Sequence, residues 1–233
     1  RSLSLPGSAG YPPFMRAPEI THLLLDLDGT LTDPQEGIIG SIQYALQQAG
    51  KPVPKHEELL WCIGPPLHES FATLAPEAST QQINEIVAHY RVRFKATGMF
   101  ENKVYEGIPE LLAQLQTRFT LYVCTSKPHT FANPILEHFG LTQFFTKIYG
   151  SELDGTRSDK AHLITHILEE NKLNSTQAIM IGDRKHDVMG AKKNGMEAIG
   201  VSWGYGSREE LTLAGAGRIA SSPMHLLKIL EID

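Results

Sequence analysis

The spacing of hydrophobic residues changes along the chain, and each spacing predicts a different kind of element. An all-apolar run at Leu23, Leu24 and Leu25 predicts a strand buried on both faces, as in a parallel sheet covered by helices. From Asp33 to Lys103 the apolar residues follow the 3.6-residue period of helices, and we expect no strand there. Beyond this block, short apolar runs alternate with helical spacing, which predicts a parallel sheet with right-handed crossovers.

Glycine and proline mark where these elements begin and end. Gly50 and Pro52 end the first helix of the block, residues 64–66 break the chain, and Gly98 follows the last helix. Pro128 is expected in the first turn of a later helix. The elements expected after residue 104 are helices at 108–115, 128–139, 161–168 and 187–194 and strands at 119–125, 147–149, 178–181 and 198–201.

We therefore expect an α/β protein, a doubly wound parallel sheet with an inserted all-helical domain. Residues 20–32 and 104–233 would form the core, and residues 33–103 a cap placed to cover the end of the first strand. The alternative, in which these helices merely pack on the sheet, stays open. Residues 1–19 lack the basic start and apolar stretch of a secretory signal, so we expect a disordered tail there, with Met15 a candidate natural start.

Composition narrows the possible functions. The chain has 233 residues, of which 41% are hydrophobic, enough for one large α/β domain or a core with a smaller insert. Its formal net charge of -5 shows no basic excess, so we expect no nucleic-acid polymer as a partner. No apolar run approaches the roughly 18 residues of a membrane-spanning helix, and we expect no membrane association. Cys62 and Cys124 lie far apart in apolar settings, which favours reduced, packed thiols and a cytoplasmic location.

Candidate chemistry begins where the first strand ends, at Asp26 and Asp28. Side chains alternate along a strand, so the two carboxylates leave it on the same side before Gly29 lets the backbone turn sharply. Two neighbouring anions resist ionising together unless a cation lies between them, and carboxylate oxygens suit a hard divalent ion, Mg2+ above all. Ligands in open α/β sheets bind beyond the carboxyl ends of the strands. In the alternative interpretation, Asp28 and Gly29 form an ordinary turn and Asp26 is a cap.

Two further strands end in polar residues. Thr125, Ser126 and Lys127 follow one, where hydroxyl groups can hold a phosphate oxygen; alternatively, Thr125 caps the next helix. Asp183 follows another strand and would add a third carboxylate, completing a site for a hard metal. Asp187 either belongs to this site or is an acidic residue at a helix start, where the helix dipole favours it.

Lys160 is unusual for its place in the chain. With Ser158 as the expected N-cap, it lies in the first turn of a helix, where the positive end of the dipole disfavours a cation. Local rules tend to be broken where function requires it, and a lysine there can hold a phosphate dianion and offset the carboxylates. A solvated surface lysine is the alternative.

Taken in order, these residues resemble the haloacid dehalogenase superfamily of phosphohydrolases. The run from Asp26 to Leu31 is similar to its first motif, Thr125 to its second, Lys160 to its third, and the run from Gly182 to Asp187 to its fourth. The helical block is similar to the mobile cap of the phosphoglycolate phosphatase-like branch, and the resemblance covers residues 21–233.

Three shorter runs, at 63–67, 153–157 and 200–206, look most like a bacterial subgroup described as 5'-nucleotidase or phosphoglycolate phosphatase. The chain departs from many phosphoglycolate phosphatases at Ala161, where they carry proline after the third-motif lysine. This departure weakens the assignment of a particular substrate and leaves the catalytic set unaffected.

The resemblance implies a Mg2+-dependent phosphatase that acts on a small phosphorylated metabolite, as a monomer or homodimer. It makes Asp26 the nucleophile that forms an aspartyl phosphate and Asp28 the acid and base of the two steps. The residues implied are Asp26, Asp28, Thr125 and Lys160 for catalysis; Gly29, Thr125, Ser126, Lys160 and Arg91 for substrate binding; and Asp26, Asp28 through its carbonyl, Asp183 and Asp187 for the metal. Residues 64–68 join Arg91 as candidates for contacts with the leaving group.

Other functions would use part of the same set. A phosphomutase of the β-phosphoglucomutase type returns the same intermediate to a sugar, and the cap decides between the two outcomes. A non-enzymatic phosphate receiver also holds an acyl phosphate, but receivers are shorter, lack a helical insert and have no use for Asp28. A dehalogenase has little use for Asp28 or a metal, and the full ligand set disfavours a catalytically silent binding protein.

Overall fold

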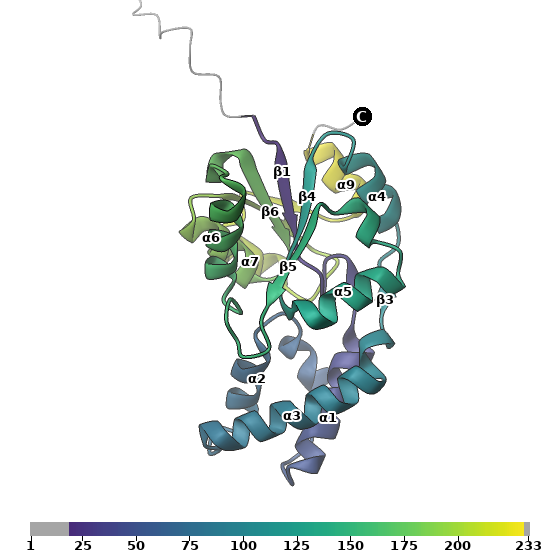
Figure 1. Cartoon of the computed structure of the whole chain (residues 1–233), viewed down its shortest axis with the longest axis vertical. Coiled ribbons are helices and arrows are strands. Elements are labelled where there is room, and N and C mark those ends of the chain that lie inside the picture. Colours follow the sequence, from purple (N-terminus) through teal and green to yellow (C-terminus); the bar gives the residue numbers. More distant parts are fainter. Residues whose placement is uncertain (1–18, 231–233) are drawn as a thin grey trace, which may run out of the picture.

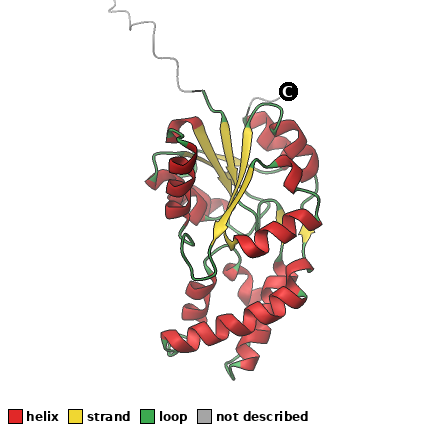
Figure 2. Ribbon diagram, viewed as in Figure 1, coloured by secondary structure: helices red, strands yellow, loops and turns green. Residues whose placement is uncertain are grey.

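The structure, a computed structural model that describes residues 19–230, is built on a six-stranded sheet with helices on both faces (Figures 1 and 2). The strand order is β5-β4-β1-β6-β7-β8, and every neighbouring pair is parallel. The strands of this sheet are β1 (His22–Leu25), β4 (Thr120–Pro128), β5 (Lys147–Ser151), β6 (Ala178–Gly182), β7 (Glu197–Val201) and β8 (Arg218–Ala220). The predicted parallel α/β sheet is confirmed, whereas the tail expected over residues 1–19 lies outside the described residues except for Glu19.

The alternation of side chains along β1 divides the core between the two faces of the sheet. Leu23 and Leu25 pack into one cluster and Leu24 into the other, and all three are buried. The first cluster includes residues of α4 (Ile108–Leu115), α5 (His129–His138) and α9 (Pro223–Ile229), and the second includes residues of α6 (Lys160–Asn171), α7 (Lys185–Lys193) and α8 (Arg208–Ala214). Burial of each leucine contributes roughly 1.5–3 kcal/mol, which holds β1 in the middle of the sheet and its carboxyl end at a defined place.

A helical segment lies beyond the carboxyl ends of the strands (Figure 1). It consists of α1 (Gln35–Gln48), the 3-10 helix η1 (His56–Cys62), α2 (Leu67–Leu74), α3 (Thr80–Ala96) and the 3-10 helix η2 (Gly98–Phe100). Two short antiparallel strands, β2 (Thr32–Asp33) and β3 (Lys103–Val104), form a ribbon at its two ends. The expectation of no strand from Asp33 to Lys103 was wrong at these two residues, because a two-residue strand has no periodicity of its own and pairs with a partner about seventy residues away. That the segment is a separate cap domain stays a prediction.

Several element boundaries differ from those expected. Strand β4 continues to Pro128, so this proline precedes α5 and does not lie in its first turn. Asp159 is the N-cap of α6, with its side chain accepting from the His162 amide at 3.0 Å, and Ser158 is not. Helix α8, strand β8 and helix α9 had no prediction. Their short lengths give too few residues for a period to be recognised.

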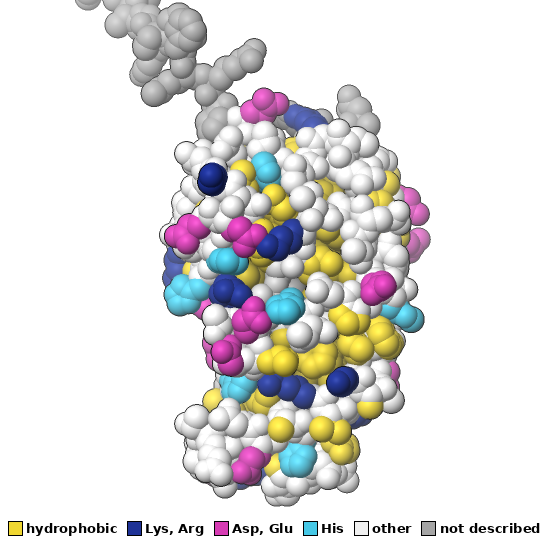
Figure 3. All heavy atoms as spheres, viewed as in Figure 1, with side chains coloured by type: hydrophobic (Ala, Val, Ile, Leu, Met, Phe, Trp, Pro, Cys, Tyr) yellow, Lys and Arg dark blue, Asp and Glu magenta, His cyan; other side chains and the backbone are white. Residues whose placement is uncertain are grey.

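Among residues 19–230, none of the helices has the length and apolar character needed to cross a bilayer. Acidic and basic side chains are interspersed on the face of the molecule shown in Figure 3. Cys62 and Cys124 are both buried and free, as the sequence predicts.

Candidate active site

The carboxyl ends of three adjacent strands bring the predicted polar residues together. Asp26 directly follows β1, Thr125 lies in β4, and Asp183 directly follows β6. Because β4, β1 and β6 are neighbours in the sheet, these three side chains meet at one edge. Lys160 reaches the same place as the first residue of α6.

Lys160 is buried and directs its ammonium group at three oxygen atoms. Its Nζ atom lies 2.8 Å from Asp187 Oδ1, 3.2 Å from Asp26 Oδ1 and 2.8 Å from the carbonyl oxygen of Cys124. Burial by itself lowers the pKa of Lys160, but Asp187 and Asp26 outweigh it and hold that pKa above its ordinary value. The lysine therefore stays charged and fixes the Asp26 carboxylate. The alternative of a solvated surface lysine does not describe its position.

Three buried carboxylates form an acidic cluster beside this lysine. Oxygen atoms of Asp26, Asp183 and Asp187 all lie within 4.8 Å of one another. Burial, followed by the charge of Asp187, raises the pKa of Asp26 to about 7, against the opposing effect of Lys160. Burial raises the pKa of Asp183 well above its usual range, and the charges of Asp187 and Asp26 add to this effect. Asp183 Oδ1 is buried without a hydrogen bond. An all-oxygen set with excess negative charge and an unpaired buried oxygen fits a hard divalent cation.

Asp28 lies apart from this cluster and is paired with Lys127. Its Oδ2 atom is 3.0 Å from Lys127 Nζ, and both side chains are almost fully enclosed. The same Nζ atom lies 4.5 Å from the centre of the Phe94 ring of α3, close enough for a cation-π contact. The Asp28 side chain is therefore free of the acidic cluster, and its predicted contact with a metal rests on its carbonyl group.

Lys127 had no predicted role, although it stood in the same polar run as Thr125 and Ser126. Its place two residues after Thr125 in β4 was the available signal, since alternate residues of a strand lie on one side. Its partner Asp28 lies on a different strand end, so the pairing depends on the neighbouring positions of β1 and β4.

Gly29 has a conformation and a position that exclude other residues. Its φ is +81°, and a Cβ atom there would overlap the carboxylate of Asp183. Its amide donates to the carbonyl oxygen of Thr32 at 2.8 Å. The structure thus shows why the turn after Asp28 needs glycine, while the predicted contact between Gly29 and a substrate stays a prediction.

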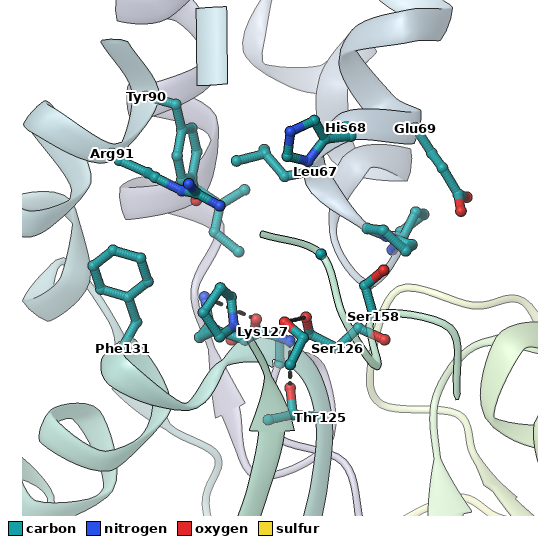
Figure 4. Close-up of a pocket in the computed structure, with 18 of the residues that line it drawn as sticks. Leu67, His68, Glu69, Tyr90, Arg91, Thr125, Ser126, Lys127, Phe131 and Ser158 are labelled. Atoms are coloured by element: carbon teal, nitrogen blue, oxygen red, sulfur yellow. Dashed lines mark hydrogen bonds and ion pairs between the residues drawn. The ribbon is translucent and has the colours of Figure 1, made fainter. Parts of the chain in front are cut away.

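A cavity of about 400 Å³ opens between the end of the sheet and the helical segment. Its walls include Asp26, Asp28, Thr125, Ser126 and Lys127 at the strand ends, Phe131 of the core helix α5, and Leu67, His68, Tyr90 and Arg91 of the helical segment. In Figure 4, Tyr90, Arg91 and His68 face Lys127 and Ser126 across this space. Thr125 Oγ1 accepts from the Lys127 amide at 3.1 Å, which leaves its own proton to donate. The cavity can therefore hold an anion beside Asp26 and a further group toward the helices.

Arg91 also connects the helical segment to the core. Its guanidinium donates at 2.6 Å to the carbonyl oxygen of Leu153, the residue before Asp154 of the cavity wall. Burial lowers the pKa of Arg91. Because the ordinary pKa of a guanidinium is very high, the group stays charged. The predicted substrate contact of Arg91 remains a prediction, and its position at the cavity wall is compatible with one.

Arg184 makes a second connection that sequence reasoning missed. Its guanidinium donates to the carbonyl oxygens of Trp61 and Ile63 in the helical segment, and its Nε atom lies 2.9 Å from Glu210 Oε1. A Cβ on Gly64 would come within 2.8 Å of Arg184 Cγ, so the chain passes close to it. Backbone carbonyl partners have no sequence signature, which is why this contact could not be predicted.

Comparison with known proteins places the chain among hydrolases. The sequence model of haloacid dehalogenase-like hydrolases matches residues 23–201. A 5'-nucleotidase of Pseudomonas aeruginosa is 50% identical over 211 residues, which cover 90% of this chain and 95% of that protein. A phosphoglycolate phosphatase of Agrobacterium fabrum is 31% identical over 191 residues, which cover 78% of this chain and 80% of the relative.

Two further matches bear on fold and function. The crystal structure of a predicted phosphatase from Clostridium acetobutylicum has a TM-score of 0.87 and 46% identity, and the match covers 92% of this chain and 100% of that chain. The tyrosine-protein kinase PtkA of Mycobacterium tuberculosis is 39% identical over 185 residues, which cover 79% of this chain but 62% of PtkA.

Proposed function

Because the chain belongs to the haloacid dehalogenase-like hydrolase family, we propose that it hydrolyses a small phosphate monoester through an aspartyl-phosphate intermediate. The observation that carries the proposal is the placement of Asp26, which is held by Lys160 and faces a cavity that Asp28 and Thr125 also line. A carboxylate fixed in this way can attack a phosphorus atom, and phosphatases among the relatives support the class of reaction.

In the first step, an oxygen of Asp26 forms a bond to phosphorus as the bond to the leaving oxygen breaks. Asp28, in the protonated form that the second step of each turnover restores, gives its proton to that oxygen. In the second step, Asp28 takes a proton from water, the water oxygen attacks phosphorus, and the bond between phosphorus and Asp26 breaks. Thr125 donates its hydroxyl proton to a phosphoryl oxygen. The ammonium group of Lys127 lies 3.0 Å from Asp28 Oδ2, at the wall of the same cavity.

Lys160 acts mainly on the nucleophile. All three of its ammonium protons have partners in Asp26, Asp187 and the Cys124 carbonyl, so a contact with phosphate requires one partner to be exchanged. Lys160 therefore orients the Asp26 carboxylate and keeps it ionised, and this second effect matters because the pKa of Asp26 is about 7.

We further propose that Mg2+ is the divalent ion, held by the side chains of Asp26, Asp183 and Asp187 and the carbonyl of Asp28. When bound, it offsets the negative charge that the carboxylates and a phosphoryl group bring together. Asp183 is the ligand best separated from the chemistry, since its Oδ1 atom is buried and unpaired and it makes no bond to the proposed substrate.

Mg2+ at about 100 times its dissociation constant should raise the melting temperature by about 5–10 °C. At this concentration a ligand of the folded state adds about 2.7 kcal/mol to the free energy of unfolding. In a chain of this size, 1 kcal/mol corresponds to about 2–4 °C. Asp183→Asn should melt higher than the wild type without Mg2+ and show no Mg2+ shift. The reason for the first effect is that burial raises the pKa of Asp183, so its ionised form destabilises the folded state at neutral pH.

A thermal-shift titration measures both effects. Asp154→Asn is the matched control, since this exposed carboxylate lies on the wall of the same cavity but outside the acidic cluster. It should keep the full Mg2+ shift. An equal shift in Asp183→Asn would show that the ion binds elsewhere.

The helical segment, residues 33–103, is proposed to act as a cap. Residues 20–32 and 104–233 form the core that it covers. Its contacts with the core through Arg91 and Arg184 exclude bulk water from Asp26 and place side chains against the leaving group. A cavity of about 400 Å³ has room for a leaving group larger than glycolate, and the 5'-nucleotidase among the relatives supports a nucleoside monophosphate as the substrate. The cytoplasmic location and the monomer or homodimer stay predictions.

A panel of phosphate monoesters tests the function: phosphoglycolate, nucleoside 5'-monophosphates and sugar phosphates, each with and without Mg2+. We expect inorganic phosphate to be released only with Mg2+, and fastest from a nucleoside monophosphate. Release of a sugar bisphosphate or an isomerised sugar phosphate in place of inorganic phosphate would support the phosphomutase alternative. A stable phospho-aspartate with no turnover on any ester would support a receiver and contradict the proposed function.

A further inference from the structure

The loop after β7, residues 202–206, has no part in the proposed mechanism, yet it encloses Asp183. The Tyr205 amide donates to Asp183 Oδ2 at 2.7 Å. A Cβ atom on Gly204 or on Gly206 would overlap atoms of Asp183, so glycine is needed at both positions for so close an approach. The position of Asp183 therefore depends on where this loop lies.

Two side chains attach the same loop to the segment that leads from β1 to the helices. Trp203 Nε1 donates to the carbonyl oxygen of Thr30 at 3.0 Å. The Tyr205 hydroxyl donates to Asp33 Oδ1, and Asp33 is a buried carboxylate of the β2–β3 ribbon. The loop is thus attached to the segment that enters the helical segment. Because β2 pairs with β3, the loop is connected through this ribbon to the returning strand as well.

We propose that Tyr205 is a positioning residue that links Asp183, a candidate metal ligand, to Asp33 in the ribbon between the sheet and the helical segment. Its amide binds one carboxylate and its hydroxyl binds the other, so a displacement of the ribbon moves the loop and changes the position of Asp183. The affinity of the metal site then depends on the position of the ribbon that carries the helical segment. This inference rests on the proposed function for the identity of the metal site.

The test is a calorimetric titration of the whole protein with Mg2+ alone. Tyr205→Phe keeps the ring and the amide but removes the hydroxyl contacts with Asp33 and Tyr105, and we expect Mg2+ to bind more weakly by up to about tenfold. The loss of one hydrogen bond to a charged group sets this upper limit. Tyr122→Phe is the matched control, because it removes a 2.9 Å hydroxyl bond to Asn171. It should bind Mg2+ like the wild type.

A double-mutant cycle isolates the Tyr205–Asp33 pair. Asp33→Ala also removes contacts with Gln35 and Lys103, so its own effect is larger than that of Tyr205→Phe. The double variant should bind Mg2+ no more weakly than Asp33→Ala alone. Fully additive effects, or wild-type affinity in Tyr205→Phe, would overturn this inference and leave the proposed function intact. A wild-type protein that binds no Mg2+ would overturn the metal centre and this inference together.

Discussion

Asp26→Asn should lower phosphate release from the best monoester by at least about 10⁴-fold while leaving the fold intact. The amide has the shape of the carboxylate but is not a nucleophile, so no bond to phosphorus can form. The change also removes one of three crowded buried charges, and the raised pKa of Asp26 shows that the folded state tolerates its neutral form. The melting temperature should therefore stay close to that of the wild type. Steady-state release of phosphate and a circular dichroism melt measure the two quantities.

Asp28→Asn is the matched comparison, since it makes the same change two residues away. Asp28 belongs to the pair with Lys127 and not to the acidic cluster, so the nucleophile remains in place. An activated ester with a good leaving group should still phosphorylate this variant, and the phospho-enzyme should accumulate because the second step lacks its base. Retained turnover in Asp26→Asn would contradict the covalent step. Unaffected hydrolysis in Asp28→Asn would show that Asp28 is not the acid and base.

Lys160→Met should reduce both activity and stability strongly. The methionine fills much of the same space, but it leaves Asp26 and Asp187 without their shared cation in a buried site. Removal of one partner of a buried ion pair costs roughly 3–5 kcal/mol, which is a large part of the 5–15 kcal/mol that stabilises a typical domain. Turnover should fall by at least about 10²-fold, because the Asp26 carboxylate loses the group that orients it. Urea unfolding without Mg2+ and single-turnover rates with Mg2+ measure these effects.

Two controls separate this prediction from a general loss of charge. Lys193→Met removes an exposed lysine of α7 and should change the free energy of unfolding by less than about 0.5 kcal/mol. Lowering the pH from above 7 toward 7 should reduce the difference between Lys160→Met and wild type. Without Lys160 the pKa of Asp26 lies above its wild-type value of about 7, so Asp26 takes up a proton in the variant first and loses its unpaired charge. An unchanged unfolding midpoint in Lys160→Met would mean that the lysine does not offset the carboxylates.

The central strand and the polar residues at the strand ends were predictable, because the spacing of apolar residues within one short stretch specifies each of them. The uninterrupted run from Leu23 to Leu25 identified the central strand because residues buried on both faces cannot alternate with polar ones. The carboxyl ends of parallel strands meet at one edge, so the positions of Asp26, Thr125 and Asp183 followed from their places after apolar runs. Short elements such as β2 and β8 were missed or had no prediction, since two or three residues show no period.

The sequence by itself determined the parallel sheet, its helical insert and the polar residues at the strand ends, because each of these depends on the order of residue types within one short stretch. Only the tertiary structure decided which partners those residues have: Lys127 for Asp28, backbone carbonyls of the helical segment for Arg184, and the Tyr205 amide for Asp183. Each of these contacts joins residues from different elements. Their distances are set by how the sheet and helices pack, and no local spacing records that packing.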